Sequence, residues 1–390
     1  WHQTIGYGVN PAGVLGARYL IDSQVPVSVD FTNLDGIDTT TDADFAGIYV
    51  RSDNVTLSHL ANIRAGAADI AIDGSNVSVS DVTFSDPDSS VSEVGVVLLD
   101  GASDVSISDS TFASQWFSSI LIDGDTLNPT TVSNISIDNV TSRGVEAGAH
   151  LDIEDGAVVN GLSVTNSTFG ATGELFTTNA VYVNPAVTVT DLTFTNNTVV
   201  QGTGAEVNAF FFLGGAGNTS TFTNTVIDGN TFQGQSTAKP LSRIIGTNGA
   251  TWNNLEYTNN NAEFTRGILM AGTINGGTFT GNTFTRTLEP AGAALSLGLS
   301  GAATMTDVTV ADNFFDTPWS DDGIRVQGSN AENVVIENNR IHDFYADISK
   351  SAIALIAPGT NNVVRGNELV QHLDRADGVD LPTTRANHLA

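Results

Sequence analysis

A histidine, two carboxylates and a tyrosine form the densest group of ionisable residues in this sequence of 390 residues. His150, Asp152 and Glu154 alternate with apolar residues, and a period of two places every second side chain on the same face of a strand. The segment around Tyr182 repeats this alternation, which predicts that Tyr182 lies beside Asp152 when the two segments are neighbouring strands. On an outer face, these four groups could serve as acid, base and stabiliser in the cleavage or epimerisation of a sugar polymer. The alternative is a solvated strand, because an acidic chain brings carboxylates together by chance.

The dipeptide Asp-Gly recurs after short apolar stretches, and its carboxylates are the candidate metal ligands. One interpretation is a repeated turn, in which Gly takes a positive φ and Asp bonds to its own backbone. If the turns were stacked in register, the carboxylates would repel one another and a bound Ca²⁺ would relieve the repulsion. No Gly-Gly-x-Gly-x-Asp calcium repeat is present, so we expect no required cofactor, with Ca²⁺ as the alternative. The four residues are Asp73, Asp100, Asp123 and Asp155.

A nine-residue unit recurs along the chain, for example as DLTFTNNTV (191–199), NTVIDGNTF (224–232) and GGTFTGNTF (276–284). Twelve copies are recognisable, and the fourth position is apolar in all of them. Positions two and four are predicted to point inward and positions three and five outward, as in a half-buried strand. A second apolar stretch lies between successive units and supplies another strand. The pattern predicts an all-β solenoid of about twelve stacked coils whose strands form parallel sheets.

The seventh position of the unit is Asn in seven consecutive copies. In stacked coils, each Asn can hydrogen-bond to the equivalent Asn above and below, which satisfies amides that would otherwise be buried unpaired. Asn also tolerates the left-handed backbone conformation that a sharp bend requires. We therefore predict a structural asparagine ladder formed by Asn197, Asn230, Asn260, Asn282, Asn313, Asn339 and Asn367.

These nonapeptides resemble the repeats of right-handed parallel β-helix proteins, both the pectate-lyase-like superfamily and bacterial surface β-solenoids. The resemblance covers about residues 50–370 and implies a single-stranded, right-handed parallel β-helix. We expect residues 1–50 to form an N-terminal cap and first coil, residues 51–370 the β-helix, and residues 371–390 a C-terminal tail or cap. Because this scaffold carries lyases, hydrolases, epimerases, phage tailspikes, adhesins and structural proteins, the resemblance specifies the fold and not the function.

The charge balance excludes several classes of partner. With 14 Lys and Arg against 43 Asp and Glu, the formal net charge is −29, which disfavours nucleic acids and anionic membrane surfaces. No apolar run approaches the roughly 20 residues that span a bilayer as a helix, so we expect no membrane span. There is no cysteine, which excludes disulfides and thiol chemistry. Acidic, cysteine-free and rich in Thr, Ser, Asn and Gly, the composition is typical of a bacterial secreted or cell-surface protein.

Two functional hypotheses follow, and the sequence leaves open whether the protein is an enzyme. The first is an extracellular structural or adhesive β-solenoid that contacts a glycan or other subunits of a surface assembly. The second is a secreted polysaccharide-active hydrolase, lyase or epimerase whose candidate residues are His150, Asp152, Glu154 and Tyr182. The Asn-x-Ser/Thr triplets, for example at Asn54, Asn76, Asn134 and Asn166, are expected to be by-products of the repeat unit.

Overall fold

The protein consists of short strands joined by turns and bends, and the described residues contain no helix. The computed structural model describes residues 16–31, 37–39, 45–85, 94–113, 115, 117–124, 129–145, 148–171, 179–201, 209–213, 219–234, 243–247, 249–263, 265–285, 293–299, 302–316, 322–345, 351–356, 359–372 and 383–384. Contacts between residues divide the chain into two compact units, Trp1–Ala205 and Glu206–Ala390, which we call unit 1 and unit 2.

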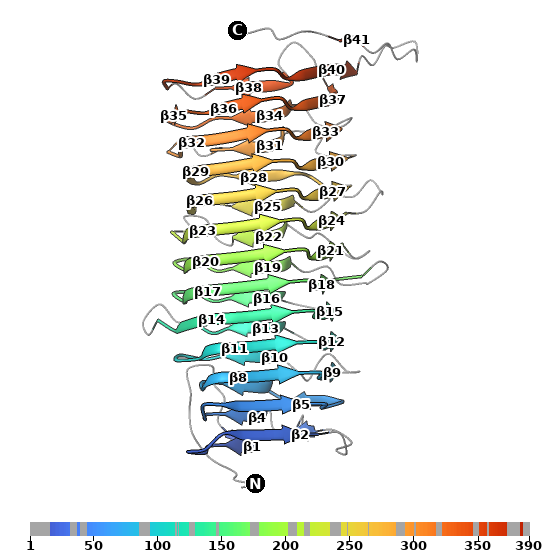
Figure 1. The fold of residues 1–390 in the computed structure, drawn as a ribbon, viewed down its shortest axis with the longest axis vertical. Coiled ribbons are helices and arrows are strands. Elements are labelled where there is room, and N and C mark those ends of the chain that lie inside the picture. Colours follow the sequence, from blue (N-terminus) through green and yellow to red (C-terminus); the bar gives the residue numbers. More distant parts are fainter. Residues whose placement is uncertain are drawn as a thin grey trace. The chain divides into compact units, whose positions relative to one another are not determined.

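Unit 1 is built from three parallel sheets, to which each coil contributes one strand in turn (Figure 1). Sheet A consists of β1 (Gly16–Ile21), β4 (Phe45–Val50), β7 (Ala68–Ile72), β10 (Val94–Leu98), β13 (Ser118–Ile122), β16 (Ala149–Ile153) and β19 (Asn179–Val183). Sheet B consists of β2 (Val27–Asp30), β5 (Val55–Ser58), β8 (Ser75–Ser80), β11 (Ser103–Ser108), β14 (Thr131–Asp138), β17 (Val158–Thr165) and β20 (Thr188–Thr195). Sheet C consists of β3 (Ile37–Thr39), β6 (Ile63–Ala65), β9 (Thr83–Ser85), β12 (Thr111–Ala113), β15 (Thr141–Arg143), β18 (Thr168–Phe169) and β21 (Thr198–Val200).

Unit 2 repeats the same plan. Its sheet A strands are β22 (Ala209–Leu213), β25 (Arg243–Thr247), β28 (Ile268–Met270), β31 (Ala293–Leu297), β34 (Asp322–Val326) and β38 (Ile353–Leu355). Its sheet B strands are β23 (Thr221–Asp228), β26 (Thr251–Thr258), β29 (Thr273–Thr280), β32 (Thr304–Ala311), β36 (Val335–Glu337) and β39 (Val363–Arg365), and β35 (Asn330–Glu332) also pairs with β32. Its sheet C strands are β24 (Thr231–Gln233), β27 (Asn261–Glu263), β30 (Thr283–Thr285), β33 (Phe314–Asp316), β37 (Arg340–Tyr345), β40 (Glu368–His372) and the antiparallel β41 (Thr383–Thr384).

The predicted class is correct, since the chain is a right-handed parallel β-solenoid. Sheet A contains thirteen described strands, one per coil, seven in unit 1 and six in unit 2, against the predicted number of about twelve coils. Each nonapeptide copy supplies one strand of sheet B and the bend that follows it.

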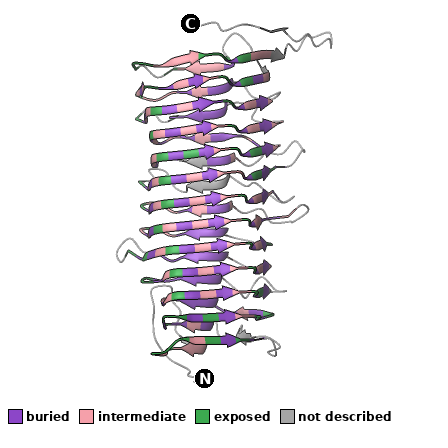
Figure 2. Cartoon of the chain, viewed as in Figure 1, coloured by how far each residue is buried: buried purple, intermediate pink, exposed green. Residues whose placement is uncertain are grey.

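Apolar residues stack in register from coil to coil and form the core. In sheet B, Ile137 pairs with Val164, which in turn pairs with Phe194. In sheet C, the rings of Phe84 and Phe112 stack with centroids 4.2 Å apart. Buried and partly exposed residues alternate along the sheet B strands, as Figure 2 shows. Positions two and four of the unit thus point inward as predicted, and burial of these stacks is the main stabilisation of a solenoid coil.

The asparagine ladder is present in unit 2. Five asparagines donate from Nδ2 to Oδ1 of the asparagine in the next coil, from Asn230 to Asn260 to Asn282 to Asn313 to Asn339 to Asn367, at 2.9, 3.1, 2.9, 2.9 and 3.0 Å. The backbone N–H of each donor residue bonds to the same oxygen. In unit 1, Asn197 donates to the carbonyl of Val164 at 2.9 Å and accepts from the backbone of Ser167 at 2.9 Å.

The left-handed residues do not lie at position seven, where we predicted them. The ladder asparagines at position seven do not have positive φ; positions one and six do, and these residues are mostly exposed. At position one they are Asn54, Asn76, Asp104, Asn134, Gly161, Asp191, Asn224, Asn254, Gly276, Asp307, Asn333 and Asn361. At position six they are His59, Asp81, Asp109, Asn139, Asn166, Asn196, Gly229, Asn259, Gly281, Asp312, Asn338 and Gly366. The bends therefore need Asn, Asp or Gly outside the core, whereas position seven needs an amide for hydrogen bonding.

Candidate functional site

Asp152 lies beside Tyr182, as predicted, because the two residues are register partners on β16 and β19. Only 2% of Asp152 is exposed. The hydroxyl of Ser118 donates to its Oδ2 at 3.5 Å, and the amide of Asn184 donates to its Oδ1 at 3.2 Å. Ser118 belongs to the preceding coil and Asn184 to the following one, so three successive coils surround one carboxyl group.

Asp152, Glu154 and Tyr182 belong to one cluster of ionisable groups. Burial keeps the carboxyl groups of Asp152 and Glu154 protonated up to neutral pH. Desolvation raises the pKa of Asp152 from 3.8 to about 7. Desolvation, the neighbouring charges of Asp123 and Asp152, and a hydrogen bond with Asp123 raise the pKa of Glu154 from 4.5 to about 7. Burial and the charges of Asp152 and Asp155 also raise the pKa of Tyr182, so its phenol remains a hydrogen-bond donor at neutral pH. The cluster can therefore hold a proton and release it near pH 7.

His150 does not belong to this cluster, and its predicted position beside Asp152 and Glu154 is wrong. Its Nδ1 is 2.6 Å from the hydroxyl of Ser142 in sheet C, and its ring lies 5.9 Å from that of Phe169, also in sheet C. The Ser142 hydroxyl is in turn 2.6 Å from that of Ser119. Desolvation lowers the pKa of His150 to about 3. All five residues of β16 are buried, so burial along this strand does not alternate as the sequence pattern predicted.

Asp123 takes the place in the cluster that we assigned to His150. The backbone N–H of Asp123 bonds to the carbonyl of Leu98, and that of Glu154 bonds to the carbonyl of Ile122. The two carboxylates thus occupy the same position after the strand in neighbouring coils, and 4% of Asp123 is exposed. In the sequence, Asp123 and Glu154 each directly follow an apolar strand. This shared position could have indicated that the two carboxylates lie in neighbouring coils.

The four Asp-Gly carboxylates do not form one row. Asp73 and Asp123 are the first residues after their strands. Asp100 and Asp155 lie one residue further along, because Leu99 and Glu154 are the first residues after those strands. Asp100 accepts from the backbone of Thr131 at 2.9 Å, and Asp73 accepts from Tyr49 at 2.8 Å. Both partners belong to other coils, so these bonds join neighbouring coils and are not the bond to the residue's own backbone that the turn interpretation predicts.

Two of the glycines behave as the turn interpretation predicts. Gly101 and Gly156 have φ of 94° and 77°, but Gly74 and Gly124 do not have positive φ. Within the described ranges, no three His, Cys, Asp or Glu side chains come together in a way that could hold a metal ion.

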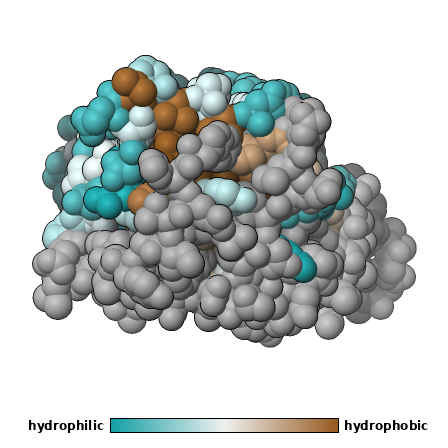
Figure 3. Space-filling model, turned by 90° about the horizontal axis from the view of Figure 1, so that it is seen from below, coloured by the Kyte–Doolittle hydropathy of each residue, from teal (hydrophilic) through white to brown (hydrophobic). Residues whose placement is uncertain are grey.

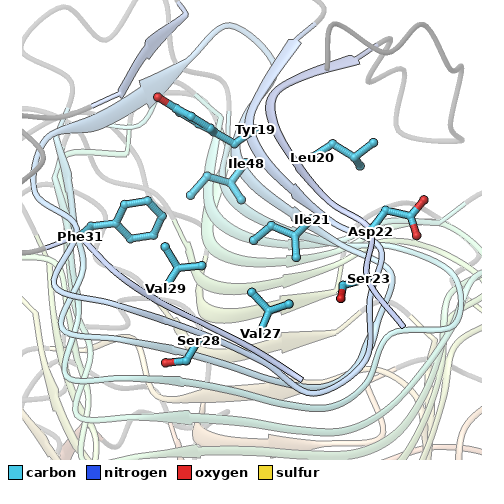
Figure 4. A pocket seen from close by; sticks show the side chains of 10 residues that line it. All are labelled: Tyr19, Leu20, Ile21, Asp22, Ser23, Val27, Ser28, Val29, Phe31 and Ile48. Atoms are coloured by element: carbon cyan, nitrogen blue, oxygen red, sulfur yellow. The ribbon is translucent and has the colours of Figure 1, made fainter. Parts of the chain in front are cut away.

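A cavity of about 420 Å³ lies at the N-terminal end of unit 1. Ile21, Val27, Val29 and Ile48 point into it from β1, β2 and β4 (Figure 4). Seen from below, this end carries a group of apolar residues framed by hydrophilic ones (Figure 3). The cavity contains no cluster of ionisable groups among its described lining residues, and we assign it no chemistry.

The family model "Right handed beta helix region" matches residues 31–199 and 266–381, so the chain belongs to the right-handed β-helix family. No curated protein sequence matches this chain. Across the described segments, no helix combines the length and the hydropathy needed to cross a membrane.

The solved structures with a similar fold have low sequence identity to this chain. A tailspike protein of E. coli bacteriophage HK620 is 11% identical, with a TM-score of 0.49, over 94% of this chain and 71% of that chain. DFA-IIIase from Arthrobacter chlorophenolicus A6, without its lid, is 12% identical, with a TM-score of 0.36, over 78% and 71%. The Dettilon tailspike protein is 11% identical, with a TM-score of 0.36, over 90% and 61%. Likenesses of this degree transfer no residue role or activity.

Proposed function

We propose that this protein is a secreted, glycan-processing β-helix in which Asp152 and Glu154 are the acid–base pair. One observation carries the proposal: two neighbouring carboxyl groups have pKa values of about 7. A general acid is most effective when its pKa lies near the working pH, and burial is the usual means of raising it. A strand with no role beyond solubility gains nothing from buried carboxyl groups, because burial of an ionisable group costs stability.

The spacing of the two groups supports the same reaction class. Asp152 and Glu154 are two residues apart along the chain, which separates their Cα atoms by roughly 7 Å. Two carboxyl groups several ångströms apart can flank one glycosidic bond, one protonating the leaving oxygen and the other assisting attack or taking a proton. Tyr182 is the register partner of Asp152 on β19, and we propose that its phenol donates a hydrogen bond to the same sugar.

The test is a panel of neutral and acidic glycans, with and without added Ca²⁺, followed by reducing ends and by absorbance from new double bonds. We expect product with the wild-type protein and at least a hundredfold less with Asp152→Asn or Glu154→Gln. Glu256→Gln is the matched control, since Glu256 is an exposed carboxylate on β26 in unit 2. Unchanged activity in both cluster variants, or absence of product with every glycan, would overturn the proposal.

The second candidate is an extracellular structural or adhesive β-solenoid that binds a glycan or other subunits without turnover. The outer face of sheet B in unit 1 favours it. Positions three and five of the six copies there carry a hydroxyl group, with the single exception of Asp138. Retention of unit 1 on immobilised glycans, equal for wild type and Asp152→Asn and without product, would support this candidate over the enzyme.

A further inference from the structure

The negative charge of this chain is concentrated in unit 1. The sequence of unit 1 contains 25 Asp and Glu, four Arg and no Lys, which gives a formal net charge of −21. Unit 2 has 18 Asp and Glu against ten Lys and Arg, and its formal net charge is −8. A field of negative sign raises the local concentration of cations and lowers that of anions. The charge of a ligand therefore affects its approach to the cluster of Asp152, Glu154 and Tyr182.

The four arginines of unit 1 lie away from this cluster, which is built on β13, β16 and β19 of sheet A. Arg18 is on β1, whereas Arg64 on β6 and the exposed Arg143 on β15 belong to sheet C. Arg51 directly follows β4, and two strands of sheet A, β7 and β10, separate β4 from β13. Three intervals of roughly 4.8 Å place Arg51 about 14 Å along the sheet from the level of Asp123, beyond the screening length of about 10 Å at 0.1 M salt. None of these arginines is placed to neutralise an anion bound at the cluster.

The groups that surround the two carboxyl groups are acids and uncharged donors. Ser118 and Asn184 donate hydrogen bonds to Asp152. Glu154 is half-buried and Asp155 is exposed, so the more open side of the cluster also carries carboxyl groups. A sugar carboxylate or phosphate bound here would be an unpaired charge in a partly buried site, which is costly. The hydroxyl groups of an uncharged sugar can instead donate to carboxylates and accept from amides and hydroxyls.

Unit 2 shows that the fold accepts a cation at the position of Asp152. Arg325 and Asp152 are each the fourth residue of a five-residue strand of sheet A, β34 and β16. Arg325 donates from Nε to the buried Asp322 at 2.9 Å, and the two side chains form an ion pair. An arginine beside an acid is therefore compatible with sheet A, and the acidic surroundings of Asp152 are a property of unit 1.

We propose that the Asp152 cluster acts on an uncharged glycan and cleaves it by hydrolysis. This inference rests on the proposed function and names the substrate class of the same site. In the hydrolysis, one carboxyl group transfers its proton to the leaving oxygen as the glycosidic C–O bond breaks, and water bonds to the anomeric carbon while its proton passes to the other carboxylate. Elimination is disfavoured, because it forms an enolate beside a substrate carboxylate and both negative charges would lie among carboxyl groups.

The experiment compares polymers that differ only in charge. Soluble β-glucan, galactan and mannan are each assayed beside a form whose C6 alcohol has been oxidised to a carboxylate. Reducing ends and absorbance from new double bonds are the two readouts. We expect kcat/KM to be about tenfold higher or more for the uncharged polymer that is cleaved best than for its oxidised form. We expect no new double bonds from either form.

Charge reversal beside the site gives a second test. Asp155→Arg adds a cation at an exposed position next to Glu154, so the preference for the uncharged polymer should fall by roughly threefold or more. Glu256→Arg is the matched control, because it makes the same change of charge on the outer face of sheet B in unit 2 and should keep the wild-type preference.

Three results would overturn this inference alone: an oxidised polymer cleaved as well as its parent, new double bonds from any acidic glycan, or a preference that Asp155→Arg leaves unchanged. Absence of product from every polymer would overturn the proposed function and this inference with it.

Discussion

Two ionisable residues of β16 respond to pH in opposite ways because their surroundings differ. His150 is held by Ser142 and lies against Phe169 in sheet C, and its pKa is lowered from 6.5 to about 3 by desolvation. The unfolded chain therefore takes up a proton at His150 at a pH where the folded chain does not. This residue lowers the free energy of unfolding as the pH falls from about 6.5 to about 3.

Asp152 has the opposite effect on stability. Its pKa is about 7 in the folded protein against 3.8 for the ordinary side chain, so the folded state retains a proton that the unfolded state releases. The free energy of unfolding should fall by up to about 4 kcal/mol as the pH rises from 4 to 7 through this group. Asp152→Asn should flatten that part of the pH profile in urea titrations and be more stable than wild type above pH 7. A wild-type slope retained by Asp152→Asn but lost in Glu256→Gln would contradict the assignment.

Tyr257 has a buried hydroxyl with no hydrogen-bond partner among the described residues. Burial raises its pKa well above the ordinary value, and its ring lies near those of Phe279 and Phe284. Tyr257→Phe removes an unsatisfied polar group and leaves the ring packing intact, so the free energy of unfolding should rise by about 1 kcal/mol. Tyr49→Phe is the contrasting variant, because it removes the bond to Asp73 and should not stabilise. A destabilised Tyr257→Phe would show that the hydroxyl is satisfied.

At the scale of elements, the asparagine ladder fixes the bend between sheets B and C in unit 2. Asn282 donates to Tyr257 and Asn313 and accepts from the side chain and backbone of Asn260. Asn282→Ala leaves these buried partners unsatisfied and should cost about 3 kcal/mol. Ser110 holds the same position in unit 1 and makes fewer bonds, so Ser110→Ala should cost about 1 kcal/mol. Equal losses in chemical denaturation would count against a stabilising ladder.

The strands were predictable from the sequence because their alternation repeats in copy after copy. Ile107, Ile137 and Val164, for example, all lie in the core where position four predicted them. The error at His150 arises because all five residues of β16 are buried, and a strict period of two does not allow this. Asp123 was missed because its proximity to Glu154 depends on coil register, and the spacing of copies varies too much to give that register from sequence alone.

At the scale of the whole molecule, electrostatic repulsion is the dominant long-range effect. The formal net charge of −29 destabilises any compact state, and salt screens this repulsion. The screening length falls from about 10 Å at 0.1 M salt to about 3 Å at 1 M. The Tm should therefore rise between 0.05 M and 1 M KCl, and similarly in NaCl, in differential scanning calorimetry. A Tm that is constant or falls with salt would mean that the carboxylates are already neutralised by specific partners.

The proposed function depends most directly on carboxyl groups that are still protonated near neutral pH. Selective ¹³C labelling of Asp and Glu carboxyl groups, with Asp152→Asn and Glu154→Gln to assign the signals, would measure their titration by NMR. We predict midpoints near pH 7 for both Asp152 and Glu154, from the values of about 7 that burial gives them. Midpoints near 4, as for solvated side chains, would contradict the acid–base pair.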